Sequence, residues 1–272
     1  MAAPAASSGR DGDDRGALPA AVARNVELLA ALVASDLRAR YGRGRFRMLK
    51  WLLDPFALVG VYLLLVTFVL DRPGRAPGVS LACAVIPFQL VMMAVMNGMN
   101  SVNLRRSIVL NTPLPRLMIP LSGALTETVA FAASLSLLAL MVAVYDVQLT
   151  AAVLWLPVVL AVNVLLAIAV AYLASLVGLW FRELRPFMIS FVRALFFLAP
   201  GLVPLSSIGG RAYDLIRLNP LTGLFEAYRA VVVEGHRPAG WELLYPTAVA
   251  LLLLGVLLPV YRREARHFAK VV

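Results

Sequence analysis

Cysteine and histidine are scarce in this chain, and their scarcity excludes several kinds of site. The single cysteine, Cys83, leaves no intramolecular disulfide and no cysteine-based metal site. It lies in an apolar run, where a lone cysteine packs as a small hydrophobic residue. The two histidines, His236 and His267, are far apart in the sequence. Histidine-based metal or triad chemistry is therefore poorly supplied.

The sequence motifs of common catalytic sites are absent as well. The chain contains no GxxxxGKS or GxxxxGKT phosphate loop, so it has no such site for ATP. It also lacks HExxH and GxSxG. These absences predict a protein that is not an enzyme and holds no cofactor of its own.

Charged residues make up only 15% of the 272 residues, and hydrophobic residues make up 61%. A soluble domain is about 45–50% apolar and about 25% charged, so this composition indicates a membrane protein. The net charge of +10 would suggest nucleic-acid binding in a soluble domain. In a membrane protein it is better explained by basic cytoplasmic loops, and no nucleic-acid partner is expected.

The first 50 residues precede the first long apolar segment. Residues 1–20 lack the basic start and apolar core of a signal peptide, which predicts a disordered cytoplasmic tail. The pattern of residues 21–50 predicts an amphipathic helix at the membrane interface. A basic run that attracts anionic lipid headgroups follows it. The apolar face of that helix consists of Val22, Val26, Leu29, Val33 and Leu37.

Residues 51–262 contain six apolar segments of about the 20 residues that a membrane-spanning helix needs. The predicted spans are Leu52–Leu70, Val79–Asn103, Leu117–Tyr145, Ala151–Leu179, Phe187–Pro204 and Leu243–Tyr261. In the fourth span, Ala167, Ala171 and Ser175 are spaced by four residues and allow close helix contact. The sequence therefore predicts an all-α integral membrane protein with a short basic tail at 263–272.

The distribution of positive charge predicts the orientation of these spans. With the N-terminus assigned to the cytoplasm, the three outer loops hold few of the 25 Arg and Lys residues, and Arg193 alone falls inside a span. The outer basic residues are Arg72, Arg75, Arg211, Arg217, Arg229 and Arg237. Because cytoplasmic loops carry the excess of positive charge, both chain ends are expected in the cytoplasm.

The segment Leu205–Glu242, between the fifth and sixth spans, contains a helix too short to cross. Asn219 and Pro220 are a helix-start signal, with Asn as the cap and Pro at the first position. Gly235 ends the apolar periodicity that follows. Glu226 and Arg229 are three residues apart and can meet on one face of this helix, either as a solvated surface pair or as part of an outer gate.

Few charges fall inside the predicted spans, namely Asp54, Glu127 and Arg193. An ionisable group facing lipid is costly, so Glu127 and Arg193 are expected to pair across the bundle, with a place in a substrate path as the alternative. Ion-coupled transporters usually carry more such groups along a relay. If the chain moves a substrate, the energy therefore comes from another protein.

The stretch Leu104–Pro120, LRRSIVLNTPLPRLMIP, is the place where such a protein would act. Arg105, Arg106 and Arg116 place this short, proline-punctuated stretch in water on the cytoplasmic side. The arginines serve either as contacts for a cytoplasmic partner or as topology signals only. We expect the segment as a whole to be the handle by which a partner moves the membrane part.

Several stretches resemble the permease subunits of type-2 ATP-binding-cassette exporters, especially those for lipid-linked polysaccharide, O-antigen and teichoic acid. They are LLAALVASDLRARYGRGRFRMLKWLLDPFALVGVYLLLVTFV from Leu28, NLRRSIVLNTPLPRLMIPLS from Asn103 and LNPLTGLFEAYRAVVVEG from Leu218. With the six-span layout, the resemblance covers nearly the whole chain beyond Ala21. Two departures from the family pattern are Gly-Arg-Gly-Arg-Phe-Arg before the Trp, in place of a Gly-Ser-x-Leu-Gly type run, and Leu114 in place of Phe.

The resemblance implies a homodimer of permeases with two ATPase subunits that bind Mg-ATP. It implies a coupling helix between Arg105 and Thr112, re-entrant helices between the fifth and sixth spans, and a sugar path between the two permeases lined by aromatic side chains. The candidate ATPase contacts are Arg105, Arg106, Ile108, Leu110, Pro113 and Arg116. The candidate path residues are Tyr62, Phe191, Phe196 and Phe197, although aromatic residues in spans usually pack or face lipid.

The expected function is therefore ATP-driven export of a lipid-linked cell-envelope glycan across the bacterial inner membrane. The alternative is the same architecture exporting a small hydrophobic drug or lipid. A third class, an integral membrane enzyme acting on lipid-linked sugars, would need acid/base or metal-binding groups gathered at one membrane face. The few histidines and the scattered carboxylates argue against that class.

Overall fold

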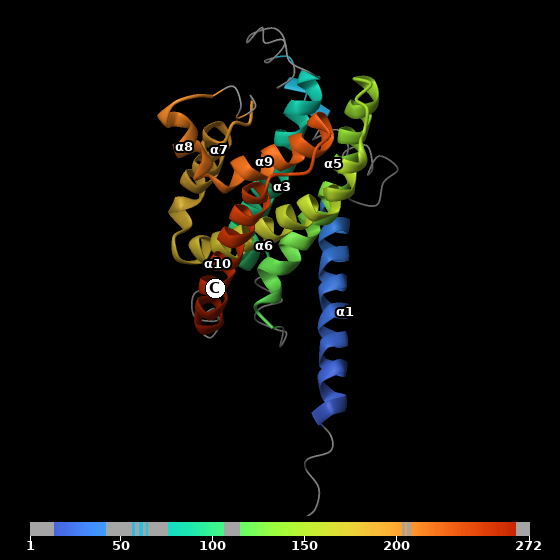
Figure 1. Ribbon diagram of the computed structural model, residues 1–272. Coiled ribbons are helices and arrows are strands. Elements are labelled where there is room, and N and C mark those ends of the chain that lie inside the picture. Colours follow the sequence, from blue (N-terminus) through green and yellow to red (C-terminus); the bar gives the residue numbers. More distant parts are fainter. Residues whose placement is uncertain are drawn as a thin grey trace, which may run out of the picture.

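The computed structural model describes residues 14–41, 56–57, 60–61, 64, 76–105, 115–202, 205 and 208–264. All regular secondary structure in these ranges is helical, in agreement with the all-α prediction. Figure 1 shows a bundle with α3 at its centre and with α1 extending past one end of it.

Four helices of the described residues are long and apolar enough to cross a membrane. They are α3 (Pro77–Leu104), α5 (Met118–Val144), α6 (Leu156–Trp180) with the preceding 3-10 turn η2 (Ala151–Trp155), and α10 (Gly240–Glu264). Their bounds confirm the predicted second, third, fourth and sixth spans as helices to within a few residues. These runs of apolar residues are long, and a run of this length predicts a helix from the sequence alone.

The predicted fifth span is not a continuous helix. Helix α7 covers Arg185–Leu198, which is 14 residues, or about 21 Å, and so is shorter than the apolar core of a bilayer. It ends because Ala199 precedes Pro200 and takes an extended conformation (ψ 139°), as residues before proline do. Most of the predicted first span, Leu52–Leu70, lies outside the described residues.

Helix α3 is the centre of the packing. In its most apolar window 78% of the residues are buried, against 17% in α10. Small residues bring α3 and α6 into backbone contact, because a Cβ on Gly98 would lie 2.6 Å from the Ala171 carbonyl oxygen. Ser101 and Ser175 complete this contact with a hydroxyl pair 3.0 Å apart. The predicted small-residue face of the fourth span is therefore where the two helices meet.

The basic ends of several helices share one end of the bundle. Figure 1 shows that α3 ends, α5 begins and α10 ends at the lower end, whereas α8 (Arg211–Arg217) and α9 (Pro220–Arg229) lie at the upper end. Arg105 follows α3 and Arg116 precedes α5, and residues 106–114 between them in the sequence lie outside the described residues.

Helix α1 covers parts of both segments predicted in the N-terminal region. It spans Asp14–Tyr41, so it begins inside the segment predicted as a disordered tail. Ala17, Leu18 and Ala20 favour helix and extend it upstream. The helix packs against α5 with its C-terminal part and otherwise continues past the lower end of the bundle (Figure 1). Its place at a membrane interface stays a prediction.

Candidate functional site

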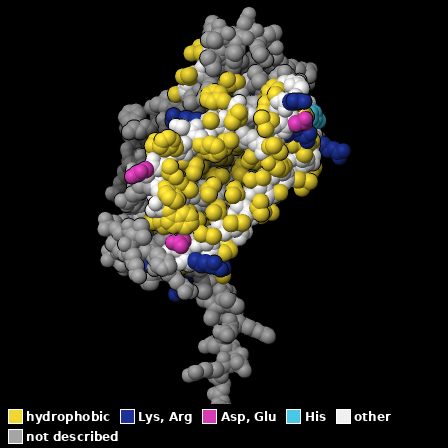
Figure 2. All heavy atoms as spheres, turned by 90° about the vertical axis from the view of Figure 1, so that its left-hand side faces the viewer, with side chains coloured by type: hydrophobic (Ala, Val, Ile, Leu, Met, Phe, Trp, Pro, Cys, Tyr) yellow, Lys and Arg dark blue, Asp and Glu magenta, His cyan; other side chains and the backbone are white. Residues whose placement is uncertain are grey.

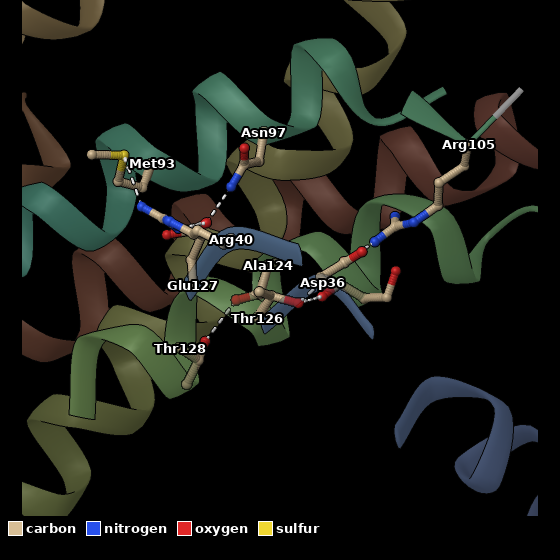
Figure 3. Close-up of polar contacts among 10 residues, drawn as sticks. Asp36, Arg40, Met93, Asn97, Arg105, Ala124, Thr126, Glu127 and Thr128 are labelled. Carbon is tan, nitrogen blue, oxygen red and sulfur yellow. Dashed lines mark hydrogen bonds and ion pairs between the residues drawn. The ribbon is translucent and has the colours of Figure 1, made fainter. Parts of the chain in front are cut away.

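The first candidate site lies where α1, α3 and α5 meet (Figure 3), and we call it the α1 cluster: Asp36, Arg40, Asn97, Arg105, Thr126 and Glu127. Asp36 and Arg40 are one helical turn apart on α1. Asp36 forms an ion pair with Arg105 at the end of α3, and Arg40 forms one with Glu127 of α5 at 2.5 Å. Asp36 and Arg40 of α1 thus each meet a residue of opposite charge on the bundle.

Hydrogen bonds from uncharged side chains complete the α1 cluster. Asn97 of α3 donates its amide to Glu127, and the Thr126 hydroxyl lies 3.3 Å from the Asp36 carboxylate that accepts from it. Only 3% of the Glu127 side chain is exposed. A carboxylate this buried requires compensating donors, and here they come from two different helices.

The predicted pair between Glu127 and Arg193 is wrong. The partner of Glu127 is Arg40, a residue of the N-terminal helix, whereas Arg193 is exposed on α7. Asp36, Arg40 and Asn97 were missed as site residues in the sequence. The available signal was the pair of opposite charges one turn apart on a helix that is otherwise apolar on one face.

Arg105 was predicted as an ATPase contact, and the structure gives its guanidinium to contacts within the chain. Arg105 is 7% exposed and donates to the Ile119 carbonyl at 2.7 Å as well as pairing with Asp36. Arg116 is partly exposed at the start of α5. The other predicted contacts, Arg106, Ile108, Leu110 and Pro113, lie outside the described residues.

A cavity of about 560 Å³ opens beside the α1 cluster. Met93 and Met96 give it an apolar wall, and the charged groups of the cluster give it a polar one. Ala39 of α1 and Gly123 of α5 also line it, from opposite sides of the contact between these helices. The polar contacts of α1 therefore border open space rather than a packed core.

The second candidate site surrounds α9, whose boundaries match the prediction. The Asn219 side chain caps the helix by accepting from the Leu221 amide at 3.0 Å, and Pro220 occupies its first position. A π-helical turn, η5 (Ala230–Glu234), follows α9 and ends at Gly235, whose φ of 74° favours glycine. Asn219 also donates to the Leu195 carbonyl, which ties α9 to α7.

Arg229 is the centre of this second site, which we call the α9 cluster: Ser80, Glu226 and Arg229 with the carbonyls of Pro200 and Gly201. Arg229 pairs with Glu226 at 2.6 Å, so the predicted contact three residues apart is confirmed. The pair is not solvated, because Arg229 is only 1% exposed.

The remaining donors of Arg229 reach two other parts of the chain. They contact the Ser80 carbonyl and hydroxyl at 3.3 and 3.2 Å and the carbonyls of Pro200 and Gly201 at 2.9 and 3.2 Å. Glu226 in turn accepts from the Leu205 amide at 3.1 Å. One guanidinium thus joins α9, the start of α3 and the segment after α7.

The predicted path aromatics separate into different environments. Phe196 is buried in the core, with its ring centroid 4.6 Å from that of Phe88 and 5.8 Å from that of Phe225, so its place is packing rather than a path surface. Phe191 and Phe197 are each 59% exposed on α7. Tyr62 lies outside the described residues.

Figure 2 shows the side of the molecule on which α7 and α8 lie, and its surface is almost entirely hydrophobic and hollowed near its centre. The few charged groups in this view stand at the margins of the apolar area. Large exposed apolar residues of α7, α8 and α10 are Phe187, Phe191, Leu198, Leu215, Leu244, Leu251 and Leu252. A contiguous apolar face marks a surface that meets lipid or a protein partner.

The turn after η5 carries an exposed histidine. His236 forms a 2.6 Å contact from Nε2 to Glu234 and a 3.0 Å contact from Nδ1 to the Arg237 carbonyl. The Arg237 carbonyl, and then Glu234, raise the pKa of His236 above its ordinary value. Among the described residues, no three His, Cys, Asp or Glu side chains gather as a metal site.

No protein-family model matches the chain, but curated proteins do. An O-antigen export system permease protein RfbA of Myxococcus xanthus is 27% identical over 246 residues, covering 89% of this chain and 94% of that protein. A Klebsiella pneumoniae protein of the same name is 23% identical over 248 residues, covering 90% and 95%. The polysialic acid transport protein KpsM of Escherichia coli is 25% identical over 240 residues, covering 85% and 91%. These similarities extend over most of the chain and confirm its resemblance to the permease subunits of type-2 ATP-binding-cassette exporters.

Proposed function

We propose that the chain is the permease subunit of an ATP-driven exporter that moves a lipid-linked polysaccharide across the bacterial cytoplasmic membrane. The observation that carries this proposal is the similarity to proteins named for O-antigen export and polysialic acid transport along 85–90% of the chain. The four apolar helices support a multi-pass membrane protein, and the large apolar surface fits lipid contact.

The proposed topology has six spans with both chain ends in the cytoplasm. In it, residues 52–70 form the first span, and α7 crosses only part of the bilayer before the chain turns back through α8 and α9 near the outer face. Non-spanning backbone is tolerated at membrane depth only where it is buried in protein, and α9 meets this condition. Of its ten residues, only Pro220 and Glu226 are not buried.

The proposed energy source is a separate ATPase that holds Mg-ATP, because this sequence has no phosphate loop. Its docking site in this proposal is the segment 106–114, which joins the end of α3 to the start of α5 in the sequence. The apolar face in Figure 2 is proposed to meet membrane lipid and, in part, a second copy of the chain, so that a glycan passes between two permeases.

The proposal is tested by loss and restoration of polysaccharide on the surface of the organism that encodes the chain. Deleting the gene is expected to remove the surface polysaccharide and to leave it inside the cell on its lipid carrier, and a plasmid copy is expected to restore export. Normal surface polysaccharide in the deletion strain, with altered efflux of a small hydrophobic compound, would overturn the glycan assignment.

The docking segment is tested by Arg106→Glu rather than by any change at Arg105, whose side chain is occupied within the chain. The Arg106→Glu permease is expected to insert normally, to lose co-purification of the ATPase and to fail in export. Arg237→Glu makes the same charge change at the exposed upper end of the bundle and is expected to export normally. Normal ATPase binding by Arg106→Glu would place the docking site elsewhere.

A further inference from the structure

Helix α1 is attached to the bundle with little apolar burial. None of the side chains from Val22 to Arg40 is fully buried: Leu29, Val33 and Leu37 are half-buried, and Val22 and Val26 are 60% and 58% exposed. Apolar burial is the usual source of stability for a packed helix. On α1 this burial is only partial, and the ion pairs of Asp36 and Arg40 add polar contacts with the bundle.

The order of charges on the two sides is complementary in one register only. α1 presents Asp36 and then, one turn later, Arg40, and the bundle presents Arg105 and then Glu127 at the matching depths. A helical turn advances about 5.4 Å along the axis. A slip of α1 by one turn would bring Arg40 to Arg105 in one direction, or Asp36 to Glu127 in the other. Both slips replace an attraction with a repulsion between like charges.

We infer that these two ion pairs are a register lock that fixes α1 to the end of α3, at Arg105, and to the first half of α5, at Glu127. Residues 106–114 join these two helices in the sequence. Asp36 and Glu127 are therefore positioning residues: they make α1 move together with the segment at which the ATPase acts. The mechanical role of α1 rests on the proposed function of that segment, whereas the lock itself is a property of the permease alone.

The burial of the two sides suits a contact that opens and closes. On α1, the side chains of Asp36 and Arg40 are 32% and 33% exposed, and the cavity beside them gives room for water to reach them. On the bundle, the side chains of Arg105 and Glu127, taken without their backbone atoms, are 9% and 3% exposed. When α1 leaves, the buried groups lose their compensating charges, which drives α1 back to the same register.

The experiment measures register by cross-linking in the purified permease without ATPase. Ala39→Cys is paired with Gly123→Cys, because both residues line the cavity and an added Cβ at Gly123 meets no atom within 4 Å. Ser35→Cys with Gly123→Cys reports the position one turn away on α1. A flexible bifunctional thiol reagent is used, and the native Cys83 stays in place because it is 0% exposed.

The lock predicts that the pair at position 39 cross-links in preference to the pair at position 35. Asp36→Asn and Asp36→Arg are each expected to lower the ratio of the two yields several-fold. Combining Asp36→Arg with Arg105→Asp restores the opposite charges and is expected to recover most of the ratio. Glu27→Arg, the matched charge reversal at an exposed position of α1, is expected to leave it unchanged.

An unchanged ratio in Asp36→Asn overturns the lock, and so does a charge-swapped double variant that inserts but recovers nothing. If the charge-reversed variants fail to insert, the isosteric Asp36→Asn decides the question alone. Failure of the export proposal does not affect this ratio, because no ATPase or glycan takes part. A variant with a lowered ratio but full export would support the lock and would show that export does not need α1 to move with residues 106–114.

Discussion

The α1 cluster and the α9 cluster use the same chemistry in opposite settings. Each joins a short or weakly buried helix to α3 through an arginine. Arg105 at the end of α3 pairs with Asp36 of α1, whereas Arg229 of α9 pairs with Glu226 of its own helix and donates to Ser80 of α3. Arg229 of the α9 cluster is 1% exposed and contacts backbone carbonyls from a separate segment. In the α1 cluster the α1 partners are each about one-third exposed and border a cavity.

This difference assigns different mechanical roles to the two clusters. A buried guanidinium whose acceptors come from several segments holds those segments together, because removing it leaves many polar groups without a partner. A pair with one half in contact with water loses less when it opens, since water replaces the lost contacts. We call the α9 cluster the fixed joint, and we call the α1 cluster the movable joint, because its pairs open at lower cost and close again in one register only.

The largest expected effect comes from breaking the fixed joint. Arg229→Met removes the charge that compensates Glu226 and the donor to three backbone carbonyls, and we expect a loss of about 3–5 kcal/mol in the free energy of unfolding. Thermal unfolding of the purified protein in detergent measures it. The matched control is Arg237→Met, an exposed arginine of the same end, with little expected effect. Equal stability of the two variants would contradict the assignment of a fixed joint.

The next effect concerns the contact between α6 and α3. Helix α3 carries Ser80 of the α9 cluster and Asn97 of the α1 cluster. A Cβ on Gly178 would lie 2.3 Å from the Met99 carbonyl oxygen, so Gly178→Ala forces the helices apart and is expected to cost about 2 kcal/mol. Gly255→Ala in α10 meets no atom within 4 Å and is expected to be neutral or slightly stabilising, because alanine favours helix. The melting temperatures of the two variants are compared directly. If they shift equally, the close contact of α3 and α6 is not needed.

A smaller effect is expected from opening the movable joint. Glu127→Gln keeps the shape of the side chain but removes the charge that Arg40 compensates, and we expect a cost of about 1 kcal/mol because Arg40 remains partly in water. Arg193→Gln, the partner expected from the sequence, should have no measurable effect on the melting temperature. If Arg193→Gln lowered the melting temperature as much as Glu127→Gln, the result would favour the predicted Glu127–Arg193 pair over the Glu127–Arg40 pair.

The smallest expected effect is the pH dependence of the exposed turn beside the α9 cluster. The pKa of His236 is raised in the folded protein, so its proton stabilises the fold. This contribution is fully present below the unfolded pKa of about 6.5 and is lost as the pH rises through the higher folded value. His236→Ala should therefore lower the melting temperature more at about pH 5.5 than at about pH 8.5. An equal shift at both pH values would show that the histidine contributes no titrating interaction.

Much of the local structure could be predicted from the residues. The four long helices followed from runs of apolar residues, and the limits of the helix at α9 followed from Asn219, Pro220 and Gly235. The contact between Glu226 and Arg229 followed from their spacing on one helix. In contrast, hydropathy predicted a fifth span through Ala199 and Pro200, where the geometry imposed by proline ends α7. The stop signal was in the sequence, but the apolar run around it concealed its effect.

By itself, the sequence determined the apolar composition of the chain, the places of four long helices and the absence of a phosphate loop. These features can be read from the sequence because composition, apolar runs and short motifs depend only on residues that are close together in it. The tertiary structure alone decided which distant residues the buried charges meet. Glu127 meets Arg40 across 87 positions of sequence, and Arg229 reaches Ser80 across 149. No local pattern encodes such pairs, since the approach of two distant side chains depends on how α1, α3, α5 and α9 pack. The distinction between a fixed and a movable joint arises at this level, from the amount of water that the packing admits to each pair.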